Sequence, residues 1–471
     1  MARALPLVLA AAVLLRLFLL ERDLDAVAIP AYELSTVGNM ARIESAVEGG
    51  LPLHRYYDNC GARLLVGLAG AALYATVDDS YRTLKLVPLA CFVLALVLLW
   101  VLVDRHVGRR AANVAALLFA FLPPTLVRFS LIAMGSHFES LPILLLVWLL
   151  FLETHARGVP ARWLAATGVA AGFSVFVSFG VVVLLVVLAG QHVLRRGLRR
   201  TAGDLRVALP AFVLGLAPLL WITAATGARP VRFLAENLPD GAASARWVDK
   251  GRELFVDVLP RAPTFPDVGP IPGRVLDVAF LLVLAAAWIA TATALRRGDG
   301  DGDGERGTRR LLLGAALLHF PVFLAFALAT DFDFHAYGSH TEVGRFRYLV
   351  PPFAVGTILV AATIARGARP VRRGLGVACV ALASAAPFVA VGPPIAGAPP
   401  PYAGHAMQYH ARTVLADVPR DPETGRLDLA AAAAAGTWRR FGDAMRGAVR
   451  FGLGHLLALD AADAGAAVDA R

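Results

Sequence analysis

The sequence predicts an all-α polytopic membrane protein with about eleven transmembrane helices. Of its 471 residues, 58% are hydrophobic and 17% are charged, and the mean hydropathy is +0.64. A soluble domain is about half apolar and about a quarter charged. The apolar residues form blocks of about 17–22 residues, the length that a helix needs to cross a bilayer. Lipid cannot satisfy backbone N–H and C=O groups, so these blocks are expected to be helices.

The apolar blocks define the predicted spans in chain order. They cover residues 4–20, 84–103, 111–127, 140–153, 163–178, 180–194, 207–226, 274–295, 311–329, 348–365 and 374–392. One further apolar stretch, Leu64 to Val77, is only about fourteen residues long, which suits a helix at the membrane surface better than a crossing. We therefore expect juxtamembrane helices in a long first outward loop, residues 21–83.

The distribution of arginine tests this choice, because cytoplasmic loops of membrane proteins are rich in positive charge. If Leu64–Val77 does not cross and the N-terminus is cytoplasmic, every strongly basic short loop faces the cytoplasm. These loops contain Arg105, Arg109, Arg110, Arg157, Arg162, Arg195, Arg196, Arg199, Arg200, Arg206, Arg296, Arg297, Arg306, Arg309, Arg310, Arg366, Arg369, Arg372 and Arg373. If Leu64–Val77 did cross the membrane, all of these arginines would face outward.

This orientation predicts a multi-pass protein of the bacterial inner membrane. Residues 1–392 form the membrane domain, and residues 393–471 form a periplasmic C-terminal tail. The loops 227–273 and 330–347 also face outward. The net charge is +10, but its arginines lie in short loops between apolar blocks, so membrane lipids are expected partners and nucleic acid is not.

Few ionisable or metal-binding groups lie within the predicted spans. Arg16, near the outer end of the first span, is expected to extend to the interface as an anchor. For His319, inside a late span, a helix-packing hydrogen bond is favoured over a functional role. The three cysteines, Cys60, Cys91 and Cys379, show neither a disulfide framework nor metal-ligand spacing.

Candidate chemistry lies in the outward loops. The first loop carries Glu33, where the chain leaves the membrane, and Asp58, before the surface helix, with His54 between them. A second cluster is His137 and Glu139 at the start of the fourth span. That pair suits either a helix cap with a dipole-favoured acid or a pair of site groups.

The third cluster runs from Asp331 to Tyr348. It includes His335 and His340, whose loose spacing leaves a divalent metal site open. Arg345 and Arg347 could hold phosphate oxygens, since arginine binds them bidentately, or could serve as interface anchors.

Two stretches carry a resemblance to a known family. Ser80 to Glu153 has a basic residue opening a span, a basic loop with Gly-Arg-Arg-Ala-Ala, and a span ending in proline. Arg345 to Pro352, RFRYLVPP, is similar to an Arg-Tyr-hydrophobic-Pro start of a late span. With its long first loop, the sequence resembles the GT-C superfamily of membrane glycosyltransferases. The branch is that of protein O-mannosyltransferases and aminoarabinose–lipid A transferases, of family 39 type.

The resemblance implies an inverting glycosyltransferase. It would take a sugar from a polyprenyl-phosphate donor and pass it to a lipid, glycan or protein acceptor in the cell envelope. The family's catalytic carboxylate lies in the first outward loop, in an Asp-Glu pair. Here Tyr32-Glu33 occupies that place, so Glu33 takes the role, with Asp58 as the second catalytic candidate. The substrate-binding candidates are His54, His137, Glu139, His335, His340, Arg345, Arg347 and Tyr348.

Two other functions stay open. A transporter or lipid flippase would place polar groups and broken helices near the membrane midplane, often in repeated halves. A catalytically inactive scaffold of the same fold is the other alternative. It is supported by the absent Asp before Glu33 and by the stretch Tyr56–Ala62, which lacks the prolines of the corresponding family motif.

Overall fold

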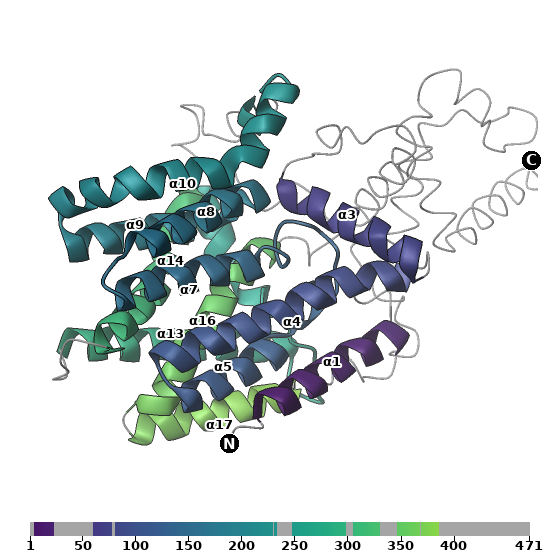
Figure 1. Cartoon of the computed structure of the whole chain (residues 1–471). Helices are drawn as coiled ribbons and strands as arrows, with labels where there is room; N and C mark the ends of the chain where they lie inside the picture. Colours follow the sequence, from purple (N-terminus) through teal and green to yellow (C-terminus); the bar gives the residue numbers. More distant parts are fainter. Residues whose placement is uncertain are drawn as a thin grey trace, which may run out of the picture.

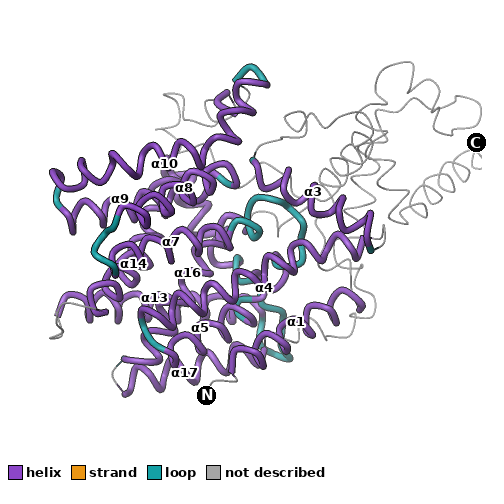
Figure 2. The backbone as a smooth tube through the Cα atoms, viewed as in Figure 1, coloured by secondary structure: helices purple, strands orange, loops and turns teal. Residues whose placement is uncertain are grey.

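The computed structural model describes residues 4–22, 60–77, 81–228, 230–232, 247–297, 305–329, 346–367 and 369–385. Over these residues the chain is helical, apart from turns and one isolated bridge between Val268 and Ile271. Figures 1 and 2 show the helices packed side by side, with loops at the ends of the bundle.

The longer helices are α1 (Ala4–Arg22), α3 (Gly61–Thr76), α4 (Tyr81–His106), α5 (Arg109–Phe121), α7 (Leu141–Ala156), α8 (Ala161–Val177), α9 (Val182–Arg196), α10 (Leu198–Ala225), α13 (Gly273–Arg297), α14 (Glu305–Ala329), α16 (Val350–Arg366) and α17 (Arg369–Ala385). The short ones are α6 (Pro124–Phe129), η3 (Phe179–Val181), α12 (Trp247–Arg252), η5 (Glu253–Val258), η6 (Leu259–Arg261) and η7 (Phe346–Leu349).

Six of the described helices are long and apolar enough to cross a membrane. They are α4, α9 with η3, α10, α13, α14, and α16 with η7. The other predicted spans correspond to shorter helices, namely α1, α5, α7, α8 and α17. The chain is therefore a helical membrane protein by length and composition, and six of the predicted crossings meet the full length requirement.

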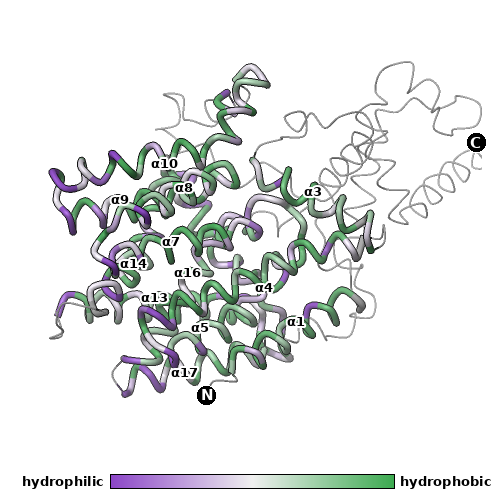
Figure 3. Tube along the Cα trace, viewed as in Figure 1, coloured by the Kyte–Doolittle hydropathy of each residue, from purple (hydrophilic) through white to green (hydrophobic). Residues whose placement is uncertain are grey.

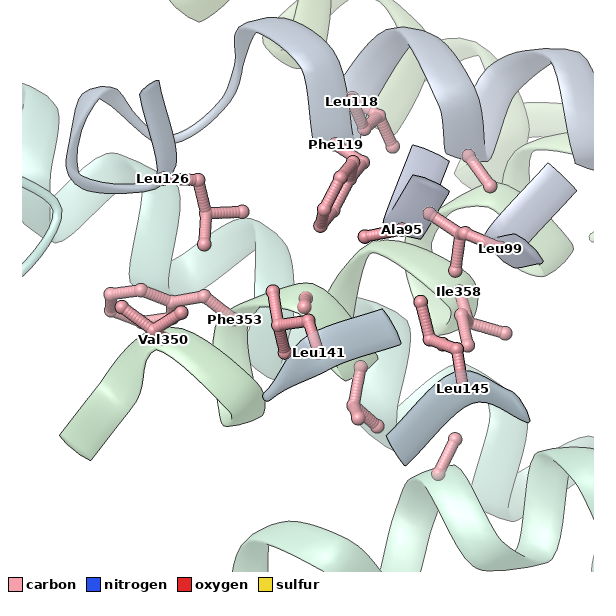
Figure 4. Close-up of a cluster of buried hydrophobic side chains, with 14 of the residues drawn as sticks. Ala95, Leu99, Leu118, Phe119, Leu126, Leu141, Leu145, Val350, Phe353 and Ile358 are labelled. Carbon is pink, nitrogen blue, oxygen red and sulfur yellow. The ribbon is translucent and has the colours of Figure 1, made fainter. Parts of the chain in front are cut away.

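An apolar core holds α4, α5, α7 and α16 together. Ala95 and Leu99 of α4 face Phe119 of α5, Leu145 of α7 and Ile358 of α16, and each of these side chains is at most 1% exposed (Figure 4). This core fixes the ends of α7 and α16, and those ends carry residues of the candidate site.

Polar contacts gather the arginine-bearing helix ends at one end of the bundle, which we call the basic end. Arg105 of α4 donates to Glu153 of α7 over 2.6 Å, and His106 of α4 contacts Thr308 of α14 over 3.2 Å. Arg366 of α16 donates to the carbonyl of Val107. Figure 3 shows hydrophilic residues gathered at the corresponding ends of α9, α10, α14 and α17.

Two tryptophan–arginine pairs lie at the basic end. The Arg109 guanidinium lies 4.4 Å from the Trp100 ring centroid, and the Arg157 guanidinium lies 4.5 Å from that of Trp163. Tryptophan and arginine are the side chains that gather at the boundary between lipid and water. These pairs are therefore suited to mark that boundary at the basic end.

The other end of the bundle, which we call the loop end, carries loop 130–140, the start of α3 and η7. The start of α3 lies against this loop, because a Cβ added to Gly135 would lie 2.7 Å from Cα of Arg63. Val77, which follows the last residue of α3, precedes the start of α4 by only a few residues. The other end of α4 lies at the basic end. Both ends of α3 therefore belong to the loop end, in agreement with a stretch that does not cross.

The predicted span 111–127 is wrong as a single helix. The helix α5 ends at Phe121, and the short helix α6 begins at Pro124. Pro123 and Pro124 cause the break, since proline has no N–H to continue the ladder and disfavours helical geometry in the residue before it. The break starts the segment that leads into loop 130–140.

The prediction that Arg16 is an interface anchor is also wrong. Its side chain is 0% exposed, and its guanidinium donates to the hydroxyl of Ser130 over 2.7 Å. A residue that extends to the interface would keep its charged group in water. Arg16 instead extends from α1 into the bundle, where it contacts Phe92 of α4 and the Ala120 carbonyl of α5.

The hydrogen bond predicted for His319 is absent among the residues that the structure describes. The His319 side chain is 1% exposed, and neither ring nitrogen has a hydrogen-bond partner in the part of the chain that the structure describes. Pro321 in the same helix leaves the carbonyl of Leu317 without its helical donor. The indole N–H of Trp288 donates to that carbonyl over 3.0 Å, which ties α13 to α14 at the proline.

Three glycines allow α8 and α10 to approach closely. A Cβ added to Gly168 would lie 2.6 Å from the carbonyl oxygen of Ala208, and one added to Gly172 would overlap the carbonyl oxygen of Phe212. From the other helix, a Cβ on Gly215 would overlap the carbonyl of Val169. Small residues spaced in this way are how membrane helices bring their backbones into contact.

Reporter fusions test which end of the bundle faces the cytoplasm. Alkaline phosphatase, which folds only where disulfides form, should be active when fused after Asp79 and inactive when fused after Asp104, because α4 separates the two positions. Activity after Asp104 would contradict the cytoplasmic placement of the basic end. Equal signals at both positions would contradict a crossing by α4.

Candidate functional site

Loop 130–140 joins α6 to α7 and carries two of the predicted site residues, His137 and Glu139. One carboxylate oxygen of Glu139 accepts a hydrogen bond of 2.8 Å from the backbone N–H of Gly135. The hydroxyl of Ser140, the residue before α7, donates to the carbonyl of His137 over 2.8 Å. Glu139 therefore closes its own loop, and no side-chain cap is formed at the start of α7.

Gly135 is required by this loop for two reasons. Its φ of +83° lies in the left-handed region, which residues with a Cβ rarely adopt. A Cβ there would also lie 2.7 Å from both Cα and Cγ of Arg63. The backbone of the loop can therefore touch the backbone of α3, which places the Arg63 side chain beside the loop.

The short helix η7, directly before α16, brings Arg347 and Tyr348 to loop 130–140. The rings of His137 and Tyr348 meet edge to face, with their centroids 4.9 Å apart. The Arg347 guanidinium lies 4.3 Å from the Tyr348 ring centroid and donates to the Tyr348 hydroxyl over 2.8 Å. Two predicted clusters that are far apart in the sequence thus meet in one site.

Arg63 is the site residue that sequence reasoning missed. The Arg63 residue is only 9% exposed, and Arg347 is 3% exposed. The charges of both arginines act on the imidazole of His137. Arg63 immediately precedes an apolar stretch and matches no motif, so only its place on α3 identifies it.

The site keeps His137 neutral. Burial lowers the pKa of His137 well below its usual value, and the charges of Arg347 and Arg63 lower it further. A neutral imidazole has one nitrogen that donates and one that accepts a hydrogen bond. The arrangement can therefore hold an anionic group on the arginines while the imidazole binds a hydroxyl.

Neighbouring helices hold the loop in place. The hydroxyl of Ser178, after α8, donates to the carbonyl of Ser136 over 3.0 Å. The thiol of Cys60, before α3, lies 3.8 Å from the carbonyl oxygen of Gly135, and Ser136 lies within hydrogen-bond reach of that thiol. The loop is thus fixed from both sides.

Six predicted site residues lie outside the described residues: Glu33, His54, Asp58, His335, His340 and Arg345. The prediction of a possible divalent metal rested on His335 and His340 and stays a prediction. Among the residues that the structure does describe, no group of three or more His, Cys, Asp or Glu side chains is placed to hold a metal ion. The C-terminal tail, residues 393–471, also lies outside the described part.

Comparison with known proteins gives little at the sequence level. No family model matches the chain, and no curated protein matches it. Among solved structures, it is similar to the oligosaccharyltransferase of Archaeoglobus fulgidus in the apo form, with a TM-score of 0.44 and 14% sequence identity. The match covers 89% of this chain and 59% of that chain, so it spans less than two thirds of the archaeal protein.

Proposed function

We propose that the chain is a membrane glycosyltransferase that moves a sugar from a polyprenyl-phosphate donor to an envelope acceptor. One observation carries the proposal. The two stretches that resemble the GT-C family, Ser80–Glu153 and Arg345–Pro352, meet through the contact between His137 and Tyr348. A resemblance confined to unrelated surfaces would not produce such a contact.

The location of the site supports a lipid-linked donor. The site lies at the loop end of the bundle, opposite the arginine-rich basic end, and the distribution of arginine favours a periplasmic loop end. A polyprenyl tail stays in the bilayer while its phosphate and sugar lie at the surface. A site on helix ends at the membrane boundary can reach both parts.

The proposed reaction is an inverting displacement. Glu33 takes the proton from the acceptor hydroxyl, whose oxygen forms a bond to the anomeric carbon of the sugar. The bond from that carbon to the phosphate oxygen breaks, and the lipid phosphate leaves with the electron pair. Arg345 and Arg347 stabilise the charge on this leaving group, and Arg63 adds to them. The groups that orient sugar or acceptor are His54, Asp58, His137, Glu139, His335, His340 and Tyr348.

Replacing the proposed base tests this function. Glu33→Gln should lower transfer in washed membranes by about a hundredfold or more, because the amide cannot accept the acceptor proton. The matched control is Glu44→Gln, which changes another carboxylate of the same loop. Glu44 and Glu48 are one helical turn apart, a spacing typical of a solvated helix face, so this change should leave transfer unchanged. Near-normal transfer by Glu33→Gln, with normal membrane insertion, would remove Glu33 from the mechanism.

One observation favours transport as the second candidate. His319 is an ionisable group in the interior of α14, and its ring nitrogens have no hydrogen-bond partner within the described residues. Intramembrane ionisable groups often line transport pathways. Movement of a lipid-linked substrate by purified protein in liposomes, without glycosyl transfer, would favour this reading. An inactive scaffold would show neither activity.

A further inference from the structure

A buried cation in the first helix has an unexpected set of partners. The Arg16 side chain is 0% exposed, and its guanidinium donates to three neutral oxygens: the Ser130 hydroxyl and the carbonyls of Ala12 and Ala120. Burying a charge inside a membrane helix is costly. An apolar side chain of similar length would avoid that cost. What the guanidinium provides, and an apolar side chain would not, is its set of N–H donors.

The hydrogen bonds of Arg16 bracket the segment that leads into the site loop. Ala120 lies at the end of α5, and Arg16 donates to its carbonyl over 3.1 and 3.2 Å. Ser130 follows α6 directly and receives the Nε–H over 2.7 Å. One planar group thus fixes both ends of the proline-broken segment, and Ser130 is the first residue of loop 130–140.

A second connection runs through aromatic rings. The Arg16 guanidinium lies 3.5 Å from the ring centroid of Phe92, in the geometry of a cation–π contact. Phe92 packs on Phe119 and Phe138, with centroids 5.8 and 6.4 Å apart, and those two rings are 6.1 Å apart. Phe138 is 1% exposed and stands between His137 and Glu139 in the chain. The buried ring therefore fixes the backbone that carries both site residues.

We propose that Arg16 is a positioning residue of the site. Through Ser130 and the three-ring cluster of Phe92, Phe119 and Phe138, it holds loop 130–140 where His137 meets Tyr348. The effect on transfer rests on the proposed function, whereas the effect on loop position does not. The two are therefore measured separately.

The first experiment measures transfer with a matched pair of variants. Ser130 and Ser174 are both 0% exposed, and each hydroxyl donates to the carbonyl three residues earlier, over 2.6 and 2.7 Å. Ser130 also receives Arg16, so Ser130→Ala removes that contact while Ser174→Ala makes the same chemical change in α8. Ser130→Ala should lower kcat about tenfold with little change in KM, and Ser174→Ala should match the parent.

The Arg16 variants extend this comparison. Arg16→Met should lower kcat per folded molecule by more than Ser130→Ala does, and Arg16→Lys should recover part of the loss, since an ammonium keeps the charge but not the planar fork. Size-exclusion chromatography in detergent gives the folded amount. Should Arg16→Met fail to fold, Ser130→Ala still decides the question. If the parent protein transfers sugar, equal kcat for Ser130→Ala and Ser174→Ala would overturn the proposal.

The second experiment follows loop position without any activity. Ser136→Cys, in a chain that also carries Cys91→Ala and Cys379→Ala, places a thiol beside Cys60. Copper phenanthroline should join the two thiols rapidly in this background, and about tenfold more slowly after Ser130→Ala or Arg16→Met. Equal cross-linking rates would overturn the proposal. Slower cross-linking in a protein that shows no transfer at all would support the positioning role while removing the proposed function.

Discussion

Replacing Gly172 with leucine should remove most of the folded protein from the membrane. The substitution puts a branched side chain where even a Cβ would overlap the carbonyl oxygen of Phe212. The overlap is with the backbone of α10, which cannot turn away as a flexible side chain could. The helices α8 and α10 would have to separate, and loss of their close backbone contact removes the packing that holds membrane helices together.

Alanine at position 172 gives a sharper test. The helix propensity of alanine should stabilise the protein, whereas the steric overlap should destabilise it. In an open helical site, Gly→Ala stabilises by about 0.5–1 kcal/mol. Gly203 of α10 is such a site, since a Cβ there meets nothing within 4 Å. We therefore expect Gly172→Ala to lower the melting temperature in detergent and Gly203→Ala to leave it unchanged or raise it. Similar shifts for the two variants would contradict the close packing of α8 on α10.

The second large effect is expected at Arg347. Arg347→Gln should lower transfer by about a hundredfold or more, the cost typical of removing one group that stabilises charge in the transition state. The control is Arg274→Gln, which removes an exposed arginine at the start of α13, also at the loop end. Transfer by Arg347→Gln at the level of this control would show that Arg347 does not contact the leaving group.

The pH dependence of stability gives Arg347→Gln an independent readout. The pKa of His137 is lowered in the folded protein, by burial and then by Arg347 and Arg63. In the unfolded chain the pKa of histidine is about 6.5. Below that pH the unfolded chain binds a proton at His137 that the folded protein does not bind, so the free energy of unfolding falls as pH falls. Removing the Arg347 charge raises the folded pKa. The loss of melting temperature between neutral and mildly acidic pH should then be smaller than in the parent.

The helices could be predicted because the apolar blocks are longer than the apolar runs that the core of a soluble protein needs. The helices α4 and α13 fall on the predicted spans 84–103 and 274–295. Both continue beyond the predicted ends with polar residues, which form helical hydrogen bonds as well as apolar ones do but carry no hydropathy signal. The break before Pro124 was missed because hydropathy does not register a missing N–H.

The site could be predicted only in part. His137, Arg347 and Tyr348 stand out as polar residues at the outward ends of apolar blocks, and the structure brings them together. Arg63 gives no such signal, since its role depends on the approach of α3 to Gly135. Arg16 was misjudged for the same physical reason. Whether a membrane arginine extends to water or turns inward depends on acceptors that lie elsewhere in the chain.

The partners of Arg16 also set an order of events during synthesis. Arg16 and Ser130 are 114 positions apart, so at about 5–20 residues per second the ribosome needs roughly 6–23 s to supply that acceptor after the arginine has been made. The Ala120 carbonyl is made only shortly before. During this interval the first helix carries a charge that its final environment does not yet satisfy. The final packing of α1 therefore has to wait until α5 and α6 have been synthesised.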